Sequence, residues 1–130
     1  MTTDLEAAEA TEFLAELVAA RSPNPPGDET LVAEAIIRKA KSLGLPPPDQ
    51  HERQKGRPNL IFKLGEGAPN LMLAAHMDTV PPGHVPSWKT EPFRLARVGE
   101  DRLAGLGYSW DLVFGSNDAH RIYMNVGWRF

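Results

Sequence analysis

The chain has 130 residues, contains no cysteine and carries a formal net charge of −3 at pH 7. The lack of cysteine excludes disulfides and thiolate metal sites, and the scattered basic residues do not form the charged patch of a nucleic-acid-binding protein. With 42% hydrophobic and 24% charged residues, no basic-then-apolar leader and no membrane-length apolar run, the chain is predicted to be a globular cytoplasmic protein with neither a membrane nor a nucleic-acid partner.

Two helices are predicted in the first third of the chain. Apolar residues recur at helical intervals from Leu5 to Val18, and the Pro-rich residues 21–27 cannot continue that helix. Asp28 is a favourable N-cap for a second helix, and Gly44 is a favourable stop. The residues expected on the inward face of the second helix are Val32, Ala35, Ile36, Ala40 and Leu43.

Strands are expected after the helices. The polar residues 51–54 are typical of an edge strand, and residues 59–64 are predicted to form a strand with Leu60, Phe62 and Leu64 on one face. The apolar run Leu71–Ala75 is typical of a strand buried on both faces, as in a parallel sheet.

A further pair of strands is predicted near residue 100. Residues 93–96 and 102–104 are expected to pair across a turn that contains Gly99. Helices that precede and follow strands indicate the α/β class.

The apolar run ends in a histidine and an aspartate two residues apart. In extended backbone, residues i and i+2 point the same way, so His76 and Asp78 are predicted to project into one cleft at the end of the strand. A carboxylate beside an imidazole is the usual arrangement at a metal-bound histidine, because one ring nitrogen binds the ion while the acid holds the other. The pair alone is weak evidence for a metal, because a histidine that follows a core strand is more often structural, and the two interpretations stay open at this point.

The order of several short motifs along the chain is more specific than this pair. These are Asn24-Pro25-Pro26-Gly27, Arg57-Pro58-Asn59-Leu60, His76-Met77-Asp78-Thr79-Val80-Pro81, Trp88, Glu91-Pro92-Phe93 and Asp101-Arg102-Leu103-Ala104-Gly105-Leu106-Gly107. Over about residues 10–107 the chain resembles a family of metal-dependent amidohydrolases and peptidases. That family contains acetylornithine deacetylase, succinyl-diaminopimelate desuccinylase, aminoacylase and glutamate carboxypeptidase.

The resemblance implies a catalytic domain of the zinc-peptidase type, here a truncated α/β part with two helices followed by a mixed sheet. It implies two divalent ions, Zn²⁺ or Co²⁺, in a site that hydrolyses amide bonds of N-acyl amino acids or small peptides. His76 matches the first metal ligand of the family, and Asp78 matches the catalytic acid that holds that histidine. Family members are often homodimers, through a domain that we expect this chain to lack.

The sequence departs from the family pattern after Gly107. Trp110 occupies the place of the metal-bridging aspartate, and an indole cannot ligate a divalent ion. Asp111 lies one position late, so it is a candidate metal ligand only if a bulge restores the direction of its side chain. Asp118 and His120 form a second acid–histidine pair, but no family motif surrounds them, and we interpret them as polar residues of a terminal loop.

These departures predict a boundary after residue 107. Residues 1–107 are interpreted as the amino-terminal part of a metallohydrolase catalytic domain, and residues 108–130 as a divergent tail. A shifted reading frame or a truncated gene would produce such a junction. We expect this chain to bind one metal ion or none and to be inactive alone. The alternative is a non-catalytic remnant or interaction module that binds at most one metal ion.

Overall fold

The computed structural model describes residues 2–67, 72–99 and 102–106, and for residues 2–6 it describes the backbone only. Two helices come first, α1 (Thr2–Ala19) and α2 (Thr30–Ser42). They are followed by β1 (Asp49–Glu52), β2 (Pro58–Ile61), the short 3-10 helix η1 (Val85–Ser87), β3 (Ala96–Val98) and β4 (Arg102–Ala104). The predicted order of two helices and then strands is confirmed, and the architecture is mixed α/β.

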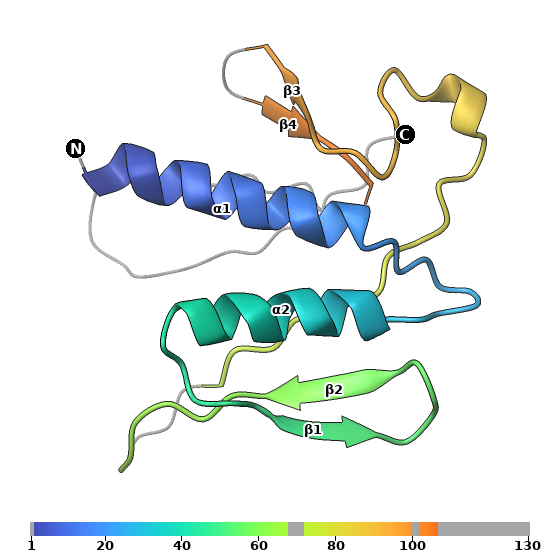
Figure 1. Ribbon diagram of the computed structural model, residues 1–130. Helices are drawn as coiled ribbons and strands as arrows, with labels where there is room; N and C mark the ends of the chain where they lie inside the picture. The colour runs from blue at the N-terminus through green and yellow to red at the C-terminus, as the bar shows by residue number, and fades with distance from the viewer. Residues whose placement is uncertain (1, 68–71, 100–101, 107–130) are drawn as a thin grey trace.

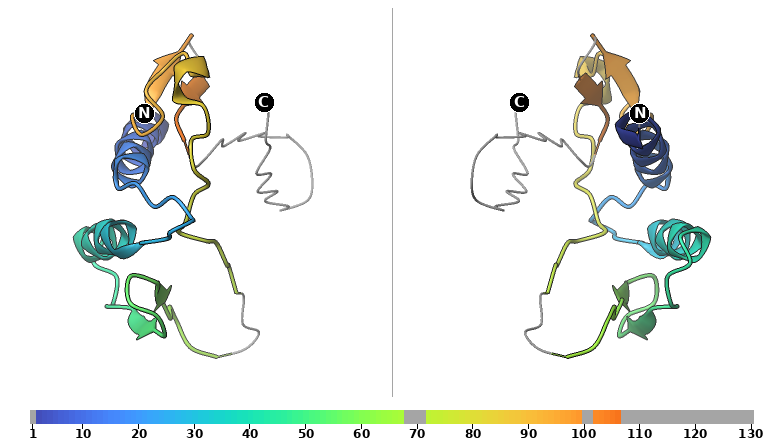
Figure 2. Two further views of the ribbon diagram at one scale, coloured as in Figure 1. Left: turned by 90° about the vertical axis from the view of Figure 1, so that its right-hand side faces the viewer. Right: turned by 90° about the vertical axis from the view of Figure 1, so that its left-hand side faces the viewer.

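The two helices lie between two small hairpins. Figure 1 shows α1 and α2 stacked on each other, with β1 and β2 beside α2 and with β3 and β4 beside α1. The side views in Figure 2 show the same order of layers. Within the described part of the chain, no helix is long and apolar enough to cross a membrane.

The carboxyl end of α2 lies where the sequence predicted it, but the predicted N-cap is wrong by one residue, because the N-cap is Glu29 rather than Asp28 and the Glu29 side chain makes no capping hydrogen bond. The Oδ1 atom of Asp28 accepts a hydrogen bond from the backbone N–H of Thr30 at 3.0 Å, which satisfies one of the free donors at the start of the helix. Gly44 has a φ of 71°, and the next N–H, that of Leu45, donates to the carbonyl of Ala40 at 3.0 Å. A glycine with positive φ just after a helix, followed by an N–H that bonds back to the last turn, is a common way for a helix to end.

The described core is small and lies mainly along the helices. Its buried apolar residues are Val18, Val32, Ala33, Ala35, Ala40 and Leu106. Of the predicted inward face of α2, Val32, Ala35 and Ala40 are buried, and Ile36 is half-buried. The prediction is wrong for Leu43, which is 58% exposed, because it is the C-cap residue and lies beyond the packed part of α2.

Both hairpins are antiparallel and both differ slightly from their predicted bounds. In the first, Asp49 pairs with Ile61, so the strands begin and end earlier than residues 51–54 and 59–64. In the second, Ala96 pairs with Ala104, and Gly99 has a φ of 74° in the turn. The predicted pairing across Gly99 is confirmed, but its first strand is residues 96–98 rather than 93–96.

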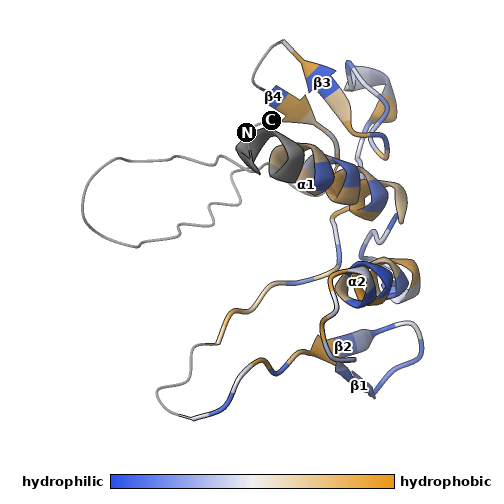
Figure 3. Cartoon of the chain, turned by 60° about the vertical axis from the view of Figure 1, so that its left-hand side comes forward, coloured by the Kyte–Doolittle hydropathy of each residue, from blue (hydrophilic) through white to orange (hydrophobic). Residues whose placement is uncertain are grey.

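The single mixed sheet and the buried strand at Leu71–Ala75 were predicted wrongly for the described residues. The strands form two separate two-stranded sheets, and residues 72–75 belong to neither. Met72 and Leu73 are 86% and 81% exposed, and Figure 3 shows their segment as an extended, largely apolar run apart from the helices. A strand buried on both faces requires neighbouring strands and covering side chains, and the described residues provide neither here.

Candidate metal centre

The segment that carries His76 and Asp78 is attached to the loop between α1 and α2. The backbone N–H of Thr79 donates to the carbonyl of Ser22 at 2.9 Å, and the N–H of Asn24 donates to the carbonyl of Thr79 at 2.7 Å. The buried Ser22 hydroxyl donates to the carbonyl of Met77 at 2.8 Å. These bonds hold the loop and the segment side by side, although more than 50 residues separate them in the chain.

The structure places His76 and Asp78 in direct contact. The Nδ1 atom of His76 lies 3.0 Å from Oδ1 of Asp78 and 2.8 Å from the backbone oxygen of Asp78. An ionised carboxylate and a carbonyl can only accept, so the neutral ring carries its proton on Nδ1. The lone pair then resides on Nε2, which is the atom left to bind an ion. The His76 side chain is 60% exposed, so solvent ions can reach the ring.

The second oxygen of Asp78 is also held. Its Oδ2 accepts a hydrogen bond from Nδ2 of Asn24 at 2.8 Å and lies 3.7 Å from Nη2 of Arg57. The Asn24 amide lowers the pKa of Asp78 below its ordinary value, and this effect outweighs burial, which acts in the opposite direction. Asp78 is therefore ionised at neutral pH, as an acceptor for His76 must be.

Arg57 also joins the site to a buried acid at the start of α2. Its Nε lies 2.9 Å from Oε2 of Glu29, whose backbone N–H donates to the carbonyl of Gly56 at 2.8 Å. Glu29 is only 4% exposed. Burial raises the pKa of Glu29 above its ordinary value, because the cost of desolvating the carboxylate exceeds the attraction of Arg57. No described group bonds to the other oxygen of Glu29, Oε1.

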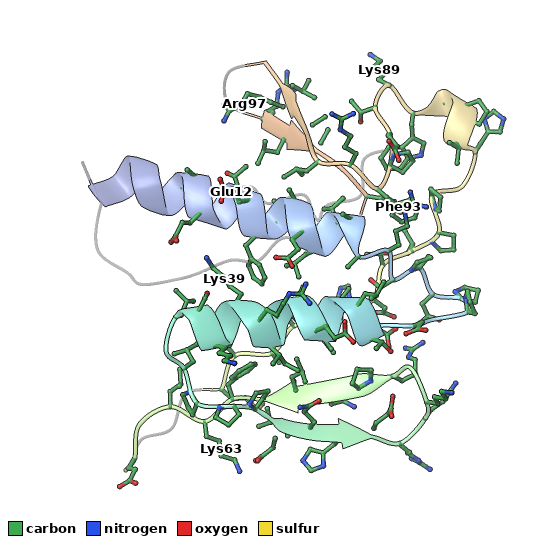
Figure 4. The ribbon with its side chains drawn as sticks, viewed as in Figure 1. Glu12, Lys39, Lys63, Lys89, Phe93 and Arg97 are labelled. Atoms are coloured by element: carbon green, nitrogen blue, oxygen red, sulfur yellow. The ribbon has the colours of Figure 1, made fainter. Side chains whose placement is uncertain are left out.

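The loop that follows Asp78 is hydrogen-bonded within itself and makes two contacts with Arg21, just after α1. The indole N–H of Trp88 donates to the carbonyl of Pro82 at 2.8 Å. The guanidinium of Arg21 lies 4.9 Å from the centroid of the Phe93 ring and 3.6 Å from the carboxylate of Glu91. Figure 4 shows Phe93 near the carboxyl end of α1, where these contacts are made.

The described residues provide one histidine ligand with its orienting acid, not a complete metal site. No group of three or more His, Asp, Glu or Cys side chains that could hold an ion is found among them. A catalytic zinc ion usually has three protein ligands. Asp111, the other candidate ligand, lies outside the described residues, as do Trp110, Asp118 and His120. The donor set therefore fits one position of a metal centre.

Sequence reasoning assigned no role to Asn24, Arg57 or Glu29, although Asn24 and Arg57 lie against the Asp78 carboxylate and Glu29 pairs with Arg57. Asn24 and Arg57 lie in the short motifs Asn24-Pro25-Pro26-Gly27 and Arg57-Pro58-Asn59, which were noted only for their order along the chain. Their contacts with Asp78 cross from distant segments, and residue spacing carries no signal for such contacts.

Curated proteins match part of the chain. Succinyl-diaminopimelate desuccinylase of Orientia tsutsugamushi (strain Boryong) is 30% identical over 98 residues, which are 74% of this chain and 24% of that protein. Acetylornithine deacetylase of Aliivibrio fischeri (strain MJ11) is 46% identical over 56 residues, 43% of this chain and 14% of that protein. Succinyl-diaminopimelate desuccinylase of Rhodopseudomonas palustris (strain BisA53) is 45% identical over 49 residues, 38% of this chain and 12% of that protein.

The chain therefore spans no more than 24% of the length of these three relatives. No protein-family model matches it, and no solved structure is significantly similar.

Proposed function

We propose that this chain, which over its matched part belongs to the amidohydrolase family of succinyl-diaminopimelate desuccinylase and acetylornithine deacetylase, supplies a metal-ligating histidine for hydrolysis of amide bonds. The proposed substrates are N-acyl amino acids or small peptides, and the proposed fold of the whole domain is of the zinc-peptidase type. His76 is the proposed ligand, and Asp78 is the proposed catalytic-site carboxylate that orients it. The observation that carries the proposal is the 3.0 Å contact between Nδ1 and Oδ1, which leaves Nε2 free.

The chemistry divides between the ion and the chain. A divalent ion such as Zn²⁺ or Co²⁺ supplies a Lewis acid that polarises an amide carbonyl and makes water more acidic. The chain keeps the proton of His76 on Nδ1, holds the ring in one orientation and places a negative charge beside it. That charge makes Nε2 a better donor to a cation, which is the usual effect of a carboxylate behind a ligating histidine.

We expect the chain alone to bind a single ion, through His76, and to hydrolyse no amide. His76 is the one family-matched ligand among the described residues, whereas catalytic zinc sites usually have three. A Zn²⁺-dependent release of acetate from N-acetylornithine by the purified chain, absent from His76→Ala, would contradict this expectation.

Zinc titration of the chain with ¹⁵N-labelled histidine tests the ligand role directly. We expect the Nε2 resonance of His76 to move on addition of Zn²⁺, with a 1:1 end point. The exposed His51 and His84 act as internal controls and are expected to move less. Asp78→Asn is expected to weaken Zn²⁺ binding by about 10- to 100-fold, as loss of an orienting acid usually does. A His76 Nε2 resonance that ignores millimolar Zn²⁺ would refute the proposal.

A further inference from the structure

We propose that Asn24 is a positioning residue for His76, and that it acts through Asp78. Its amide holds the carboxylate so that the imidazole keeps its proton on Nδ1 and leaves Nε2 free. The relevance of this to catalysis rests on the proposed function of His76. The contacts among Asn24, Asp78 and His76 need neither a metal ion nor a substrate.

The first step is that each carboxylate oxygen of Asp78 has a different partner. Oδ1 faces Nδ1 of His76 at 3.0 Å, and Oδ2 accepts from Nδ2 of Asn24 at 2.8 Å. An aspartate carboxylate rotates easily about its last bond, because that torsion is broad and roughly two-fold. A donor on Oδ2 restricts the rotation and thereby holds Oδ1 against the imidazole. A neutral imidazole can carry its proton on either nitrogen, and acceptors at Nδ1 favour the Nδ1–H tautomer. The backbone oxygen of Asp78 at 2.8 Å is one such acceptor, and an Oδ1 held in place by Asn24 adds the second.

The second step is that Asn24 is itself held in place. Its backbone N–H donates to the carbonyl of Thr79 at 2.7 Å, and the N–H of Thr79 donates to the carbonyl of Ser22 at 2.9 Å. These two bonds flank the side-chain bond between Asn24 and Asp78. The amide therefore reaches the carboxylate from backbone that is already ordered, so little further entropy is lost when the bond forms.

The third step distinguishes Asn24 from Arg57. The Nη2 atom of Arg57 lies 3.7 Å from Oδ2 of Asp78, which is too long for a hydrogen bond, whereas its Nε lies 2.9 Å from Glu29. Arg57 thus places a positive charge near the carboxylate while its directional contact goes to Glu29. The directional contact on Asp78 comes from Asn24, which is why we assign the positioning role to the amide.

The test measures the tautomer of His76 in the metal-free full-length chain, from its two ¹⁵N ring resonances. Asn24→Leu keeps a side chain of similar size but removes the donor. We expect the ratio of the Nδ1–H to the Nε2–H tautomer to fall by about two- to tenfold, the range of one hydrogen bond. Asn59→Leu is the matched control, because Asn59 is exposed and its amide donates to the carbonyl of His51 at 3.4 Å. That control should leave the ratio unchanged.

A mutant cycle with Asp78→Ala separates positioning from a general structural role. If Asn24 acts through the Asp78 carboxylate, Asn24→Leu has no further effect on the His76 ratio once Asp78→Ala is present. A structural role would also disturb His51, His84 and the backbone amide spectrum. If Asn24→Leu loses the native spectrum, Asn24→Ala replaces it, since it removes the donor without adding bulk or charge beside Asp78. An unchanged ratio in a folded Asn24 variant, or an added change in the double variant, overturns the proposal.

Zinc titration of the same samples keeps the two hypotheses apart. A ratio that depends on Asn24 in a chain whose His76 ignores Zn²⁺ would overturn the proposed function and leave the positioning role standing. A His76 that binds Zn²⁺ with a ratio independent of Asn24 would overturn the positioning role alone.

Discussion

Gly27 lies where any side chain would displace Arg57. A Cβ atom at Gly27 would lie 1.8 Å from Nη1 and 2.8 Å from Cζ of Arg57. We therefore expect Gly27→Ala to move the guanidinium away from Glu29 and leave a buried carboxylate without its cation. The loss of that partner adds about 1–3 kcal/mol of destabilisation to the backbone strain of the substitution. Urea denaturation of the full chain measures the total.

Gly44→Ala is the matched control for this prediction. Gly44 and Gly27 have φ values of 71° and 76°, but nothing lies within 4 Å of a Cβ built on Gly44. Both substitutions force alanine into the left-handed region, at about 1–2 kcal/mol each. The excess loss in Gly27→Ala therefore reports the collision with Arg57. Equal losses in the two variants would show that the guanidinium moves aside without consequence.

The residues of the site differ in how far sequence could predict them. The proximity of His76 and Asp78 follows from a spacing of two residues in extended backbone, and the structure places them together. Their roles as ligand and catalytic acid stay predictions. Asn24 meets Asp78 across 54 residues of sequence, and this contact exists only because the loop after α1 lies against residues 77–79. No local pattern encodes such a contact.

The helix α2 owes its place in the fold to one narrow apolar stripe. Val32 is 2% exposed, whereas its neighbour Leu31 is 59% exposed. We expect Val32→Ala to lower the free energy of unfolding by about 1.5–3 kcal/mol, through lost burial and the cavity left behind. Leu31→Ala removes more carbon atoms but should change the stability by less than about 0.5 kcal/mol. Chemical denaturation of both variants makes the comparison, and a larger loss in Leu31→Ala would reverse the assigned face of α2.

Helices were predicted more accurately than strands, and the reason is physical. The ends of α2 depend on Asp28 and Gly44, which act on backbone groups within a few residues. The antiparallel pair around Gly99 is nearly as local, and its prediction failed only in the bounds of the first strand. A strand inside a sheet depends on neighbouring strands from elsewhere in the chain. The residues near Leu71–Ala75 in sequence therefore do not show whether such strands lie beside it.

The arrangement of the whole molecule decides whether an apolar segment is buried. Hydropathy shows that residues 72–75 are apolar, but it does not show which surface lies against them. Among the described residues, the recorded backbone pairing of this segment lies beyond His76, where Thr79 pairs with the loop after α1. His76 thus lies between the exposed residues 72–75 and the residues that are hydrogen-bonded to the loop after α1.

Hydrogen exchange tests this arrangement. Residues 72–75 make no backbone hydrogen bond to any described residue, so a peptide covering them should exchange fully at the shortest labelling time. Amides of α2 in the same sample, which are bonded within the helix and partly buried, should exchange more slowly and serve as the internal control. The N–H groups of Asn24 and Thr79 should also be slowed, because they bond across the two segments. Protection of residues 72–75 equal to that of α2 would mean that the segment pairs as a strand after all, and would place His76 at the end of a sheet.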